Sequence, residues 1–563
     1  MRVSDYALVG ALALGLGACR DPLAVDNSNN PDRNTALGRA NDLENLLGNT
    51  YAMVHSGTLG GAVLKTGDSP NDGLQPQLLT MGMESVSALA NFAMGPRSAI
   101  PRNQIDNSIN GQGNVGNLRD FFVEHSAARL ATLALARLQV LRSLGSVTRD
   151  RRARAFGRFV QGVGLGNLAL AYDSAAVLTE DNASDAEVPL ASHDSVMRAA
   201  LADLDDAITI AGTVGTSSDG FPLPANWLNQ ATASITQTLF IQLVHSYKAR
   251  FLAGVARTPT ERALVNWPQV IAEANLGITS DFNILMSPTN GWDVAWPLQH
   301  YATGSASWHQ MSQFFMGMAD TSGGYDTWLL LAPASRAPFL VVTPDKRFPQ
   351  GTTRTAQNSD SQPASFASTR YFRNRPPSSD APGDPLQISM YDFRRSFGFF
   401  SSTRNGPYPV MTAAEIRLLA AEGYLRTGAI KSGVKLINVS RVAKGGLPPL
   451  DTLATDTSAT VPGASSCVPR VPDAAQGYHR TRCGNLWDAL KWEYRMETAF
   501  TGYGMWYFAG RRWGDLPDGT ALSWPVPYQE LQVRVVPIYG LGGVGLLGAA
   551  GPGNYGLFAG GVY

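Results

Sequence analysis

Apolar residues recur every three or four positions over much of the chain, which is the period of an amphipathic α-helix. In 42–54, for example, Leu43, Leu46, Leu47 and Tyr51 fall on one stripe. The same period is present in 118–144, 156–178, 194–211, 231–256 and 267–278. Helical periodicity dominates wherever the chain has a period, so we predict a mainly α-helical fold.

The clearest single helix is 415–427. Thr412 and Glu415 form a capping box before it, and Gly428 supplies a stop signal after it. A second helix, 432–443, follows at once, so the two predict an αα-hairpin. Such hairpins are similar to tetratricopeptide-type helix pairs, which stack into an α/α superhelix, although no strict 34-residue period is present here.

Three glycines inside a helical segment need a separate interpretation. Gly162, Gly164 and Gly166 fall within 156–178, where glycine lowers helix propensity. A dinucleotide-binding motif that began at Gly162 would need its third glycine at position 167, which is not glycine. We therefore interpret them as places where other helices approach closely.

The helical period disappears between residues 280 and 410. Tryptophan and tyrosine residues there lie among Gly, Pro, Ser and Asn, and 57–116 is similarly irregular. An irregular region this large inside a compact protein is usually functional. The segment 540–563 is Gly-rich and nearly chargeless, which is compatible with mobility or with packing on a partner.

The N-terminal segment has the pattern of an export signal. A single basic residue, Arg2, precedes an apolar run at 6–17, which is shorter than the roughly 20 residues that span a bilayer as a helix. Small residues then lead into Cys19, as in a bacterial lipobox, which predicts a lipid-modified cysteine that anchors the chain to a membrane surface. The alternative is an ordinary signal peptide that contains a cysteine.

These patterns divide the chain into six parts. We expect a signal peptide at 1–18, a polar tether at 19–33, an N-terminal helical region at 34–279, a loop-rich region at 280–410, a C-terminal region at 411–539 and the Gly-rich tail at 540–563.

Composition narrows the classes of function. Of the 563 residues, 44% are hydrophobic, so a sizeable core is available. Lys and Arg total 45, as do Asp and Glu, and this balance gives no basic field that would attract nucleic acid.

Cys467 and Cys483 are the two cysteines that follow Cys19. An exported chain meets oxidising conditions, so we expect them to form a disulfide; the alternative is a pair of free thiols. They do not predict a metal site, because two cysteines and the nearby His479 make an incomplete ligand set.

Other motifs give little support for catalysis. The seven histidines show no zinc-protease spacing, and the G-x-G-x-x-G run at 543–548 has too little chain after it for a dinucleotide-binding unit. Glu493 and Glu497 could mimic the carboxylate pair of a retaining glycosidase. Four residues apart on a helix, however, they point the same way, and Arg495 favours ion pairing.

Several motifs, taken in order, resemble the SusD/RagB family of outer-membrane lipoproteins. The lipobox and tether "ACRDPLAVDNSNNPD" come first, followed by the helix "ANDLENLLGNTYAMV". The hairpin "MTAAEIRLLAAEGYLRTGAIKSGVKLINVSRVAKGGLP" carries the family pattern at Glu415, Ala421, Glu422, Asn438 and Arg441.

The C-terminal signature of the family is also matched in part. It falls on Glu493, Arg495, Glu497, Phe500, Gly502, Arg512, Trp513 and Gly514, followed by "WPVPYQEL". Thr501 and Gly504 depart from the pattern, where the family often has Glu and Arg. These departures leave open which partners Arg511 and Arg512 have.

The resemblance implies a mainly α, SusD-like fold with tetratricopeptide-like hairpins on one side and a loop-rich, nutrient-binding surface on the other. It implies a protein that is not an enzyme, needs no cofactor, and faces the cell exterior from the outer membrane. Its partners would be an oligosaccharide or peptide ligand and the barrel of a TonB-dependent transporter.

The ligand would stack on exposed aromatic side chains, with polar neighbours reading hydroxyl groups. Our candidates for that platform are Trp292, Trp296, Trp308, Asn91 and Phe92. Two other functions remain open: a helical scaffold that stabilises the transporter without binding ligand, and a secreted glycoside hydrolase.

Overall fold

The computed structural model describes a large part of the chain. The described residues are 37–59, 73–87, 93–182, 187–215, 219–231, 234–287, 289–292, 310–360, 365–377, 389–558 and 560–563. Every structural statement below concerns these residues. The predicted signal peptide, tether and lipid site at Cys19 lie outside them.

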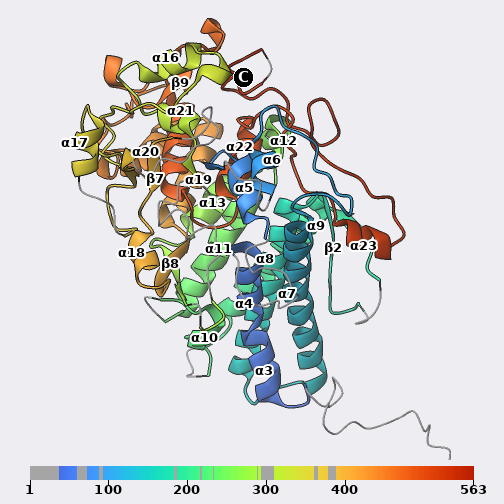
Figure 1. Cartoon of the computed structure of the whole chain (residues 1–563). Coiled ribbons are helices and arrows are strands. Elements are labelled where there is room, and N and C mark those ends of the chain that lie inside the picture. Colours follow the sequence, from blue (N-terminus) through green and yellow to red (C-terminus); the bar gives the residue numbers. More distant parts are fainter. Residues whose placement is uncertain are drawn as a thin grey trace, which may run out of the picture.

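The framework is a stack of helices in which each member packs on the next (Figure 1). The stack comprises α7 (Asn114–Leu141), α8 (Val147–Ala171), α9 (His193–Gly212), α11 (Gln237–Gly254), α13 (Trp267–Asn275), α19 (Ala413–Arg426) and α20 (Ile430–Ala443). The mainly helical fold predicted from periodicity is therefore present. Thr412 caps α19 as expected, because its hydroxyl accepts from the Glu415 amide at 3.1 Å.

Helix α8 is the most enclosed member of the stack, and glycines permit this. A Cβ on Gly162 would lie 2.8 Å from the Ala200 carbonyl oxygen of α9. A Cβ on Gly164 would lie 3.1 Å from the Glu124 carbonyl oxygen of α7, and Gly166 faces the Phe251 ring of α11. The interpretation of these glycines as close-packing sites is confirmed.

Shorter helices cover the flanks of the stack. α5 (Gln75–Met81) and α12 (Pro259–Leu264) pack on α22 (Met505–Trp513), and α6 (Met94–Ser98) packs on α5. α3 (Ala40–Gly48) and α4 (Thr50–Leu59) pack on α7, and α10 (Ala225–Leu228) packs on both of them. Tyr51 of α4 joins this layer to α11, because its hydroxyl is hydrogen-bonded to that of Tyr247 at 2.6 Å.

The loop-rich lobe departs from the stack between α13 and α19, two helices that pack against each other. Its elements are short: β4 (Phe282–Met286), β5 (Gln310–Met311), α15 (Gln313–Gly317), α16 (Gly324–Leu330), η2 (Pro333–Ser335), α17 (Arg354–Ser359), β6 (Phe372–Asn374), β7 (Tyr391–Phe393), α18 (Phe397–Ser401) and β8 (Gly406–Met411). The chain therefore leaves the stack, builds the lobe and returns beside its point of departure.

Strands in the described residues form two-stranded antiparallel ribbons. The pairs are β4 with β8, β6 with β7, β1 (Ser85–Val86) with β5, β2 (Ser174–Ala176) with β3 (Leu190–Ser192), and β9 (Arg470–Pro472) with β10 (Thr481–Cys483). In the longest ribbon, Asn283 lies opposite Pro409 and Leu285 opposite Pro407. This ribbon ties the start of the lobe to its end.

The C-terminal region holds α21 (Leu486–Thr498), α22 (Met505–Trp513) and α23 (Tyr528–Val533), with short turns η4 (Ala464–Ser466) and η5 (Ala474–Gln476) before α21. Cys467 and Cys483 are joined by a disulfide with their Cα atoms 5.8 Å apart. The bridge closes the ribbon of β9 and β10 just before α21.

The Gly-rich segment after residue 540 packs on its own chain. The Ile105 amide donates to the Leu541 carbonyl at 2.8 Å, and the Ala550 amide donates to the Thr520 carbonyl at 2.7 Å. Gly542 has φ +82, and a Cβ there would lie 2.7 Å from that of Ala521, so this position requires glycine. The composition reflects close backbone approach.

Candidate functional site

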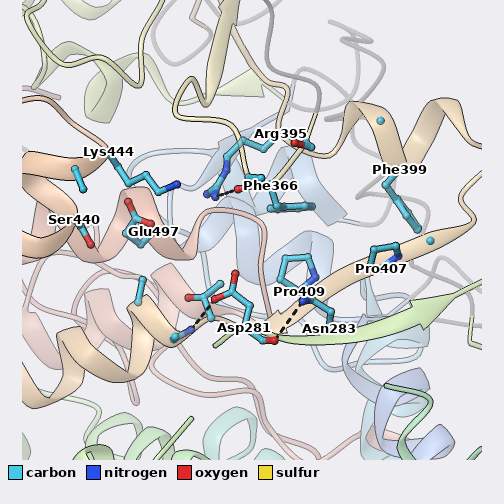
Figure 2. Close-up of a pocket in the computed structure, with 18 of the residues that line it drawn as sticks. Asp281, Asn283, Phe366, Arg395, Phe399, Pro407, Pro409, Ser440, Lys444 and Glu497 are labelled. Carbon is cyan, nitrogen blue, oxygen red and sulfur yellow. Dashed lines mark hydrogen bonds between the residues drawn. The ribbon is translucent and has the colours of Figure 1, made fainter. Parts of the chain in front are cut away.

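A cavity of about 700 Å³ lies where the loop-rich lobe meets the helix stack (Figure 2). Its walls come from residues 365–367 and 395–409 of the lobe, the first turn of α19 and the last turn of α20. A volume of this size is within the usual range of small-molecule sites, roughly 300–1,000 Å³.

The floor of the cavity is held by β8 and the start of α19. The amide of Ala413, the first residue of α19, donates to Asp281 at 2.9 Å, which fixes the helix beside the β4 strand. Asn283 of β4 lines the cavity next to Pro409 of β8, its partner across the ribbon. The position of the site therefore depends on the pairing that closes the lobe.

Two phenylalanines form an apolar wall. Phe366 and Phe399 each lie edge-on to Tyr408, with ring centroids 5.1 and 5.2 Å from that of the tyrosine. Tyr408 is buried, and its hydroxyl donates to the Phe500 carbonyl at 2.8 Å. A fixed tyrosine thus holds both rings, and Pro407 and Pro409 extend the apolar surface.

Three basic side chains line the cavity, and none has an ion pair among the described residues. Arg395 lies over the Tyr371 ring at 3.8 Å and donates to the Phe366 carbonyl. Arg417 donates to the Ser440 hydroxyl at 2.6 Å, and burial lowers the pKa of its guanidinium. The Lys444 ammonium makes no hydrogen bond within the described part of the chain. In the view of Figure 2, Lys444 and Arg395 lie toward one end and Phe399 and Pro407 toward the other.

The two carboxylates of the wall already have partners. Asp281 accepts from the Ala413 amide, and Glu497 accepts from the Tyr371 hydroxyl at 2.8 Å. Glu497 also lies 3.6 Å from the Arg347 guanidinium. The site can therefore hold a ligand by ring contacts, hydrogen bonds and positive charge.

Of the two glutamates of the C-terminal signature, Glu497 lines the cavity, whereas Glu493 is structural. Glu493 is fully buried, and Arg347 donates to both of its oxygens, at 2.7 and 3.0 Å. Burial raises the pKa of Glu493, and Arg347 offsets part of that effect. Glu493 is thus enclosed in the core, away from any substrate.

The open question about the two neighbouring arginines is also answered. Arg512 pairs with Glu422 of α19 at 2.8 Å, and the Trp513 indole donates to the same carboxylate at 3.0 Å. Arg511 instead donates to the main-chain carbonyls of Leu522 and Gly254, at 2.7 and 3.0 Å. The signature therefore packs α22 onto the helix stack.

The predicted aromatic platform is only partly visible. Trp292 is 7% exposed, and its ring lies 5.4 Å from that of His55 and 6.3 Å from that of Tyr51. It packs on α4 and offers little surface to a ligand here, so its binding role stays a prediction. The other candidates, Asn91, Phe92, Trp296 and Trp308, lie outside the described residues.

Apart from Glu497 and the capping residue Thr412, sequence reasoning did not single out the residues of the cavity. A usable signal was present in "RRSFGFFSSTRNGPYPV", residues 394–410, where basic, aromatic and proline residues gather just before the predicted hairpin. Lys444 gave no such signal, because only the fold brings the end of α20 to this segment.

Two searches of the described residues were negative. None of their helices combines the length and apolar character needed to cross a bilayer. They also contain no group of three or more His, Cys, Asp or Glu side chains placed to hold a metal ion.

Comparisons with known proteins find similarity in fold but not in sequence. No family model matches the sequence, and no curated protein is significantly similar to it. A SusD homolog from Parabacteroides distasonis matches with a TM-score of 0.54 and 14% identity, over 88% of this chain and 93% of that one. A SusD superfamily protein from Bacteroides thetaiotaomicron matches with a TM-score of 0.50 and 10% identity, over 84% and 89%. The chain therefore has the SusD-like fold along most of its length.

Proposed function

We propose that this protein is a non-catalytic, lipid-anchored binding protein of the outer membrane. It captures an oligosaccharide or peptide outside the cell and delivers it to a TonB-dependent transporter. The observation that carries the proposal is the cavity at the junction of lobe and stack, set in a SusD-like fold. Fixed ring faces beside unpaired cations suit ligand capture.

The glycoside hydrolase alternative finds less support in the geometry. A retaining or inverting hydrolase needs two carboxyl groups that flank a sugar. Glu493 is enclosed and bound on both oxygens by Arg347, and Glu497 is held by Tyr371. We therefore assign binding, and not turnover, to this protein.

Ligand capture is tested with the purified chain from residue 33 onward. Isothermal titration against panels of oligosaccharides and peptides is expected to find at least one ligand. Replacing both Phe366 and Phe399 by alanine should weaken that binding by about tenfold or more, because the ring contacts are lost. A matched control is Phe122→Ala, whose ring on α7 is 52% exposed and remote from the cavity. Absence of binding to every panel member would favour the scaffold alternative.

The anchor and the partner are tested in cells. Cys19→Ser is expected to release the protein from the outer-membrane fraction and to abolish labelling with a fatty-acid probe. The wild-type chain should co-purify with a barrel protein from detergent-solubilised membranes. Membrane retention of Cys19→Ser would contradict the lipid-anchor assignment.

A further inference from the structure

We propose that the ligand of this cavity is an acidic oligosaccharide, one whose sugar units carry carboxylate groups, as uronic acids do. The inference rests on the proposed binding function and names its substrate class. It is argued from the charges that the cavity leaves unpaired and from the shape of the strand that forms its floor.

Cations at the cavity differ from those elsewhere in the same part of the molecule. Arg347, Arg375 and Arg512 are buried and pair with carboxylates at 2.7, 3.0 and 2.8 Å. Arg395, Arg417 and Lys444 have no carboxylate partner among the described residues. An unpaired cation beside a cavity binds an anion that enters it, because a charge-assisted hydrogen bond is stronger than a neutral one.

Arg441, a buried arginine without a carboxylate partner, is bound more fully by main-chain carbonyls than the cations of the cavity are. Arg441 donates to the main-chain carbonyls of Pro448 and Val468, at 2.8 Å each. Arg395 and Arg417 each donate a single side-chain hydrogen bond, and Lys444 donates none. The cavity therefore retains donor capacity that the protein itself does not use.

The carboxylates of the wall offset only part of this charge. Asp281 is engaged by the start of α19, and Glu497 by Tyr371, as described above. Neither forms an ion pair with Arg395, Arg417 or Lys444. Three cations thus face two carboxylates, which leaves one net positive charge at the cavity, and this balance favours an anionic ligand.

The floor of the cavity favours a sugar over an extended peptide. The Leu285 amide donates to Asn229 and the Asn283 carbonyl accepts from Ala231, so both groups point away from β8. Their partners Pro407 and Pro409 therefore direct their main-chain nitrogens to the outer edge of β8. Proline has no N–H, so this edge cannot donate to an added peptide strand at either position.

The apolar wall supplies what a sugar ring needs. Phe366 and Phe399 are fixed by Tyr408 and line the cavity, and Asn283, Ser402 and Asn405 add groups that can bond hydroxyls. Aromatic faces take the apolar face of a pyranose, while the cations take its carboxylate. Both features belong to one cavity.

The test is titration with uronate tetramers built from galacturonate, glucuronate or mannuronate, each compared with its own methyl ester. The ester keeps the ring and removes the charge. At low salt, at least one acidic tetramer is expected to bind about tenfold more tightly than its ester. In 0.5 M NaCl the same acidic tetramer should bind less tightly than it does at low salt.

Two variants assign the effect to the cavity. Lys444→Met and Arg417→Gln should each weaken binding of the acidic tetramer about fivefold or more and leave binding of its ester unchanged. Lys435→Met is the matched control, because Lys435 is an exposed residue of the same helix outside the cavity. Circular dichroism confirms that each variant is folded.

The outcomes separate this inference from the proposed function. Two results would overturn the acidic assignment while ligand capture stands. One is equal binding of the acid and its ester to the wild type; the other is an equal loss of acid and ester binding in the two cavity variants. Binding of tetraglutamate in place of every sugar would overturn the sugar assignment and leave a peptide-uptake function. Binding of neither sugars nor peptides would overturn both.

Discussion

Buried carboxyl groups in this protein differ in what surrounds them. Glu422 forms ion pairs with Arg426 and Arg512 and accepts a hydrogen bond from the Trp513 indole. Its pKa is therefore lowered despite burial. Glu84 accepts a hydrogen bond from the Phe500 amide and has no cation beside it among the described residues, and burial raises its pKa to about 8. Both kinds of group make stability depend on pH, but in opposite directions: the stability from Glu422 is lost as pH falls, whereas that from Glu84 is lost as pH rises.

Glu84→Gln tests this difference. Because the folded protein holds the Glu84 proton more tightly than the unfolded chain, the free energy of unfolding contributed by Glu84 falls as pH rises from about 4.5 to about 8. Glutamine keeps the acceptor for Phe500 and carries no charge. We expect the free energy of unfolding of the variant to rise relative to that of the wild type across this pH window. The difference should reach on the order of 2–4 kcal/mol above pH 8.

Urea denaturation of both proteins at pH 4.5, 6, 7 and 8.5 measures that difference. A difference that stays constant over this range would contradict a titrating Glu84. The control is Glu187→Gln, because Glu187 has a side chain that is 73% exposed and only a long ion pair with Arg534. Its effect should remain within about 0.5 kcal/mol at every pH.

The helices show where sequence reasoning succeeds. Long amphipathic segments were found within a few residues: 118–144 corresponds to Asn114–Leu141, and 231–256 to Gln237–Gly254. Local period and capping residues determine such elements. The contact between α13 and α19 was not foreseen, because more than a hundred residues separate them and no local pattern encodes it. The cavity depends on that same closure, so its residues could not be grouped from the sequence.

Glycine spacing on α8 leads to a prediction about helix packing. Gly162→Ala improves helix propensity by about 1 kcal/mol but places a Cβ 2.8 Å from the Ala200 carbonyl oxygen. Main-chain atoms of α9 cannot turn aside as a side chain would. We therefore expect a net loss of roughly 1–3 kcal/mol in the free energy of unfolding, measured by denaturant titration.

Gly212→Ala is the matched control for this prediction. It is an exposed residue of α9 where a Cβ would meet nothing within 4 Å. Its effect should be neutral or slightly stabilising. If Gly162→Ala were equally harmless, α8 and α9 would not be as close as the structure places them.

Across the molecule, the Gly-rich segment links regions that are distant in sequence. Buried Leu541, Tyr555, Leu557 and Val562 belong to it, and Tyr555 donates to Asp488 of α21 at 2.9 Å. Sequence composition left open whether this segment is mobile or packed. The structure shows that the segment is packed through main-chain contacts. The sequence alone could not show this, because the contacts depend on the surfaces of other parts of the chain.

Removing residues 540–563 is therefore expected to destabilise the whole protein. The loss should exceed about 3 kcal/mol, because several apolar side chains lose their burial and Asp488 loses a donor. Differential scanning calorimetry measures it as a lower midpoint of unfolding. Leu546→Gln and Leu547→Gln are the controls, since these side chains are 54% and 74% exposed. A truncated chain that melts like the full one would show that the segment only decorates the surface.

The pairing of Leu541 with Ile105 also orders events in time. Ribosomes make Ile105 several hundred residues before Leu541, so the surface that receives the segment stays uncovered through most of synthesis. Folding that waits for late residues keeps a growing chain loose. The contact between Ile105 and Leu541 can therefore form only after Leu541 has been synthesised.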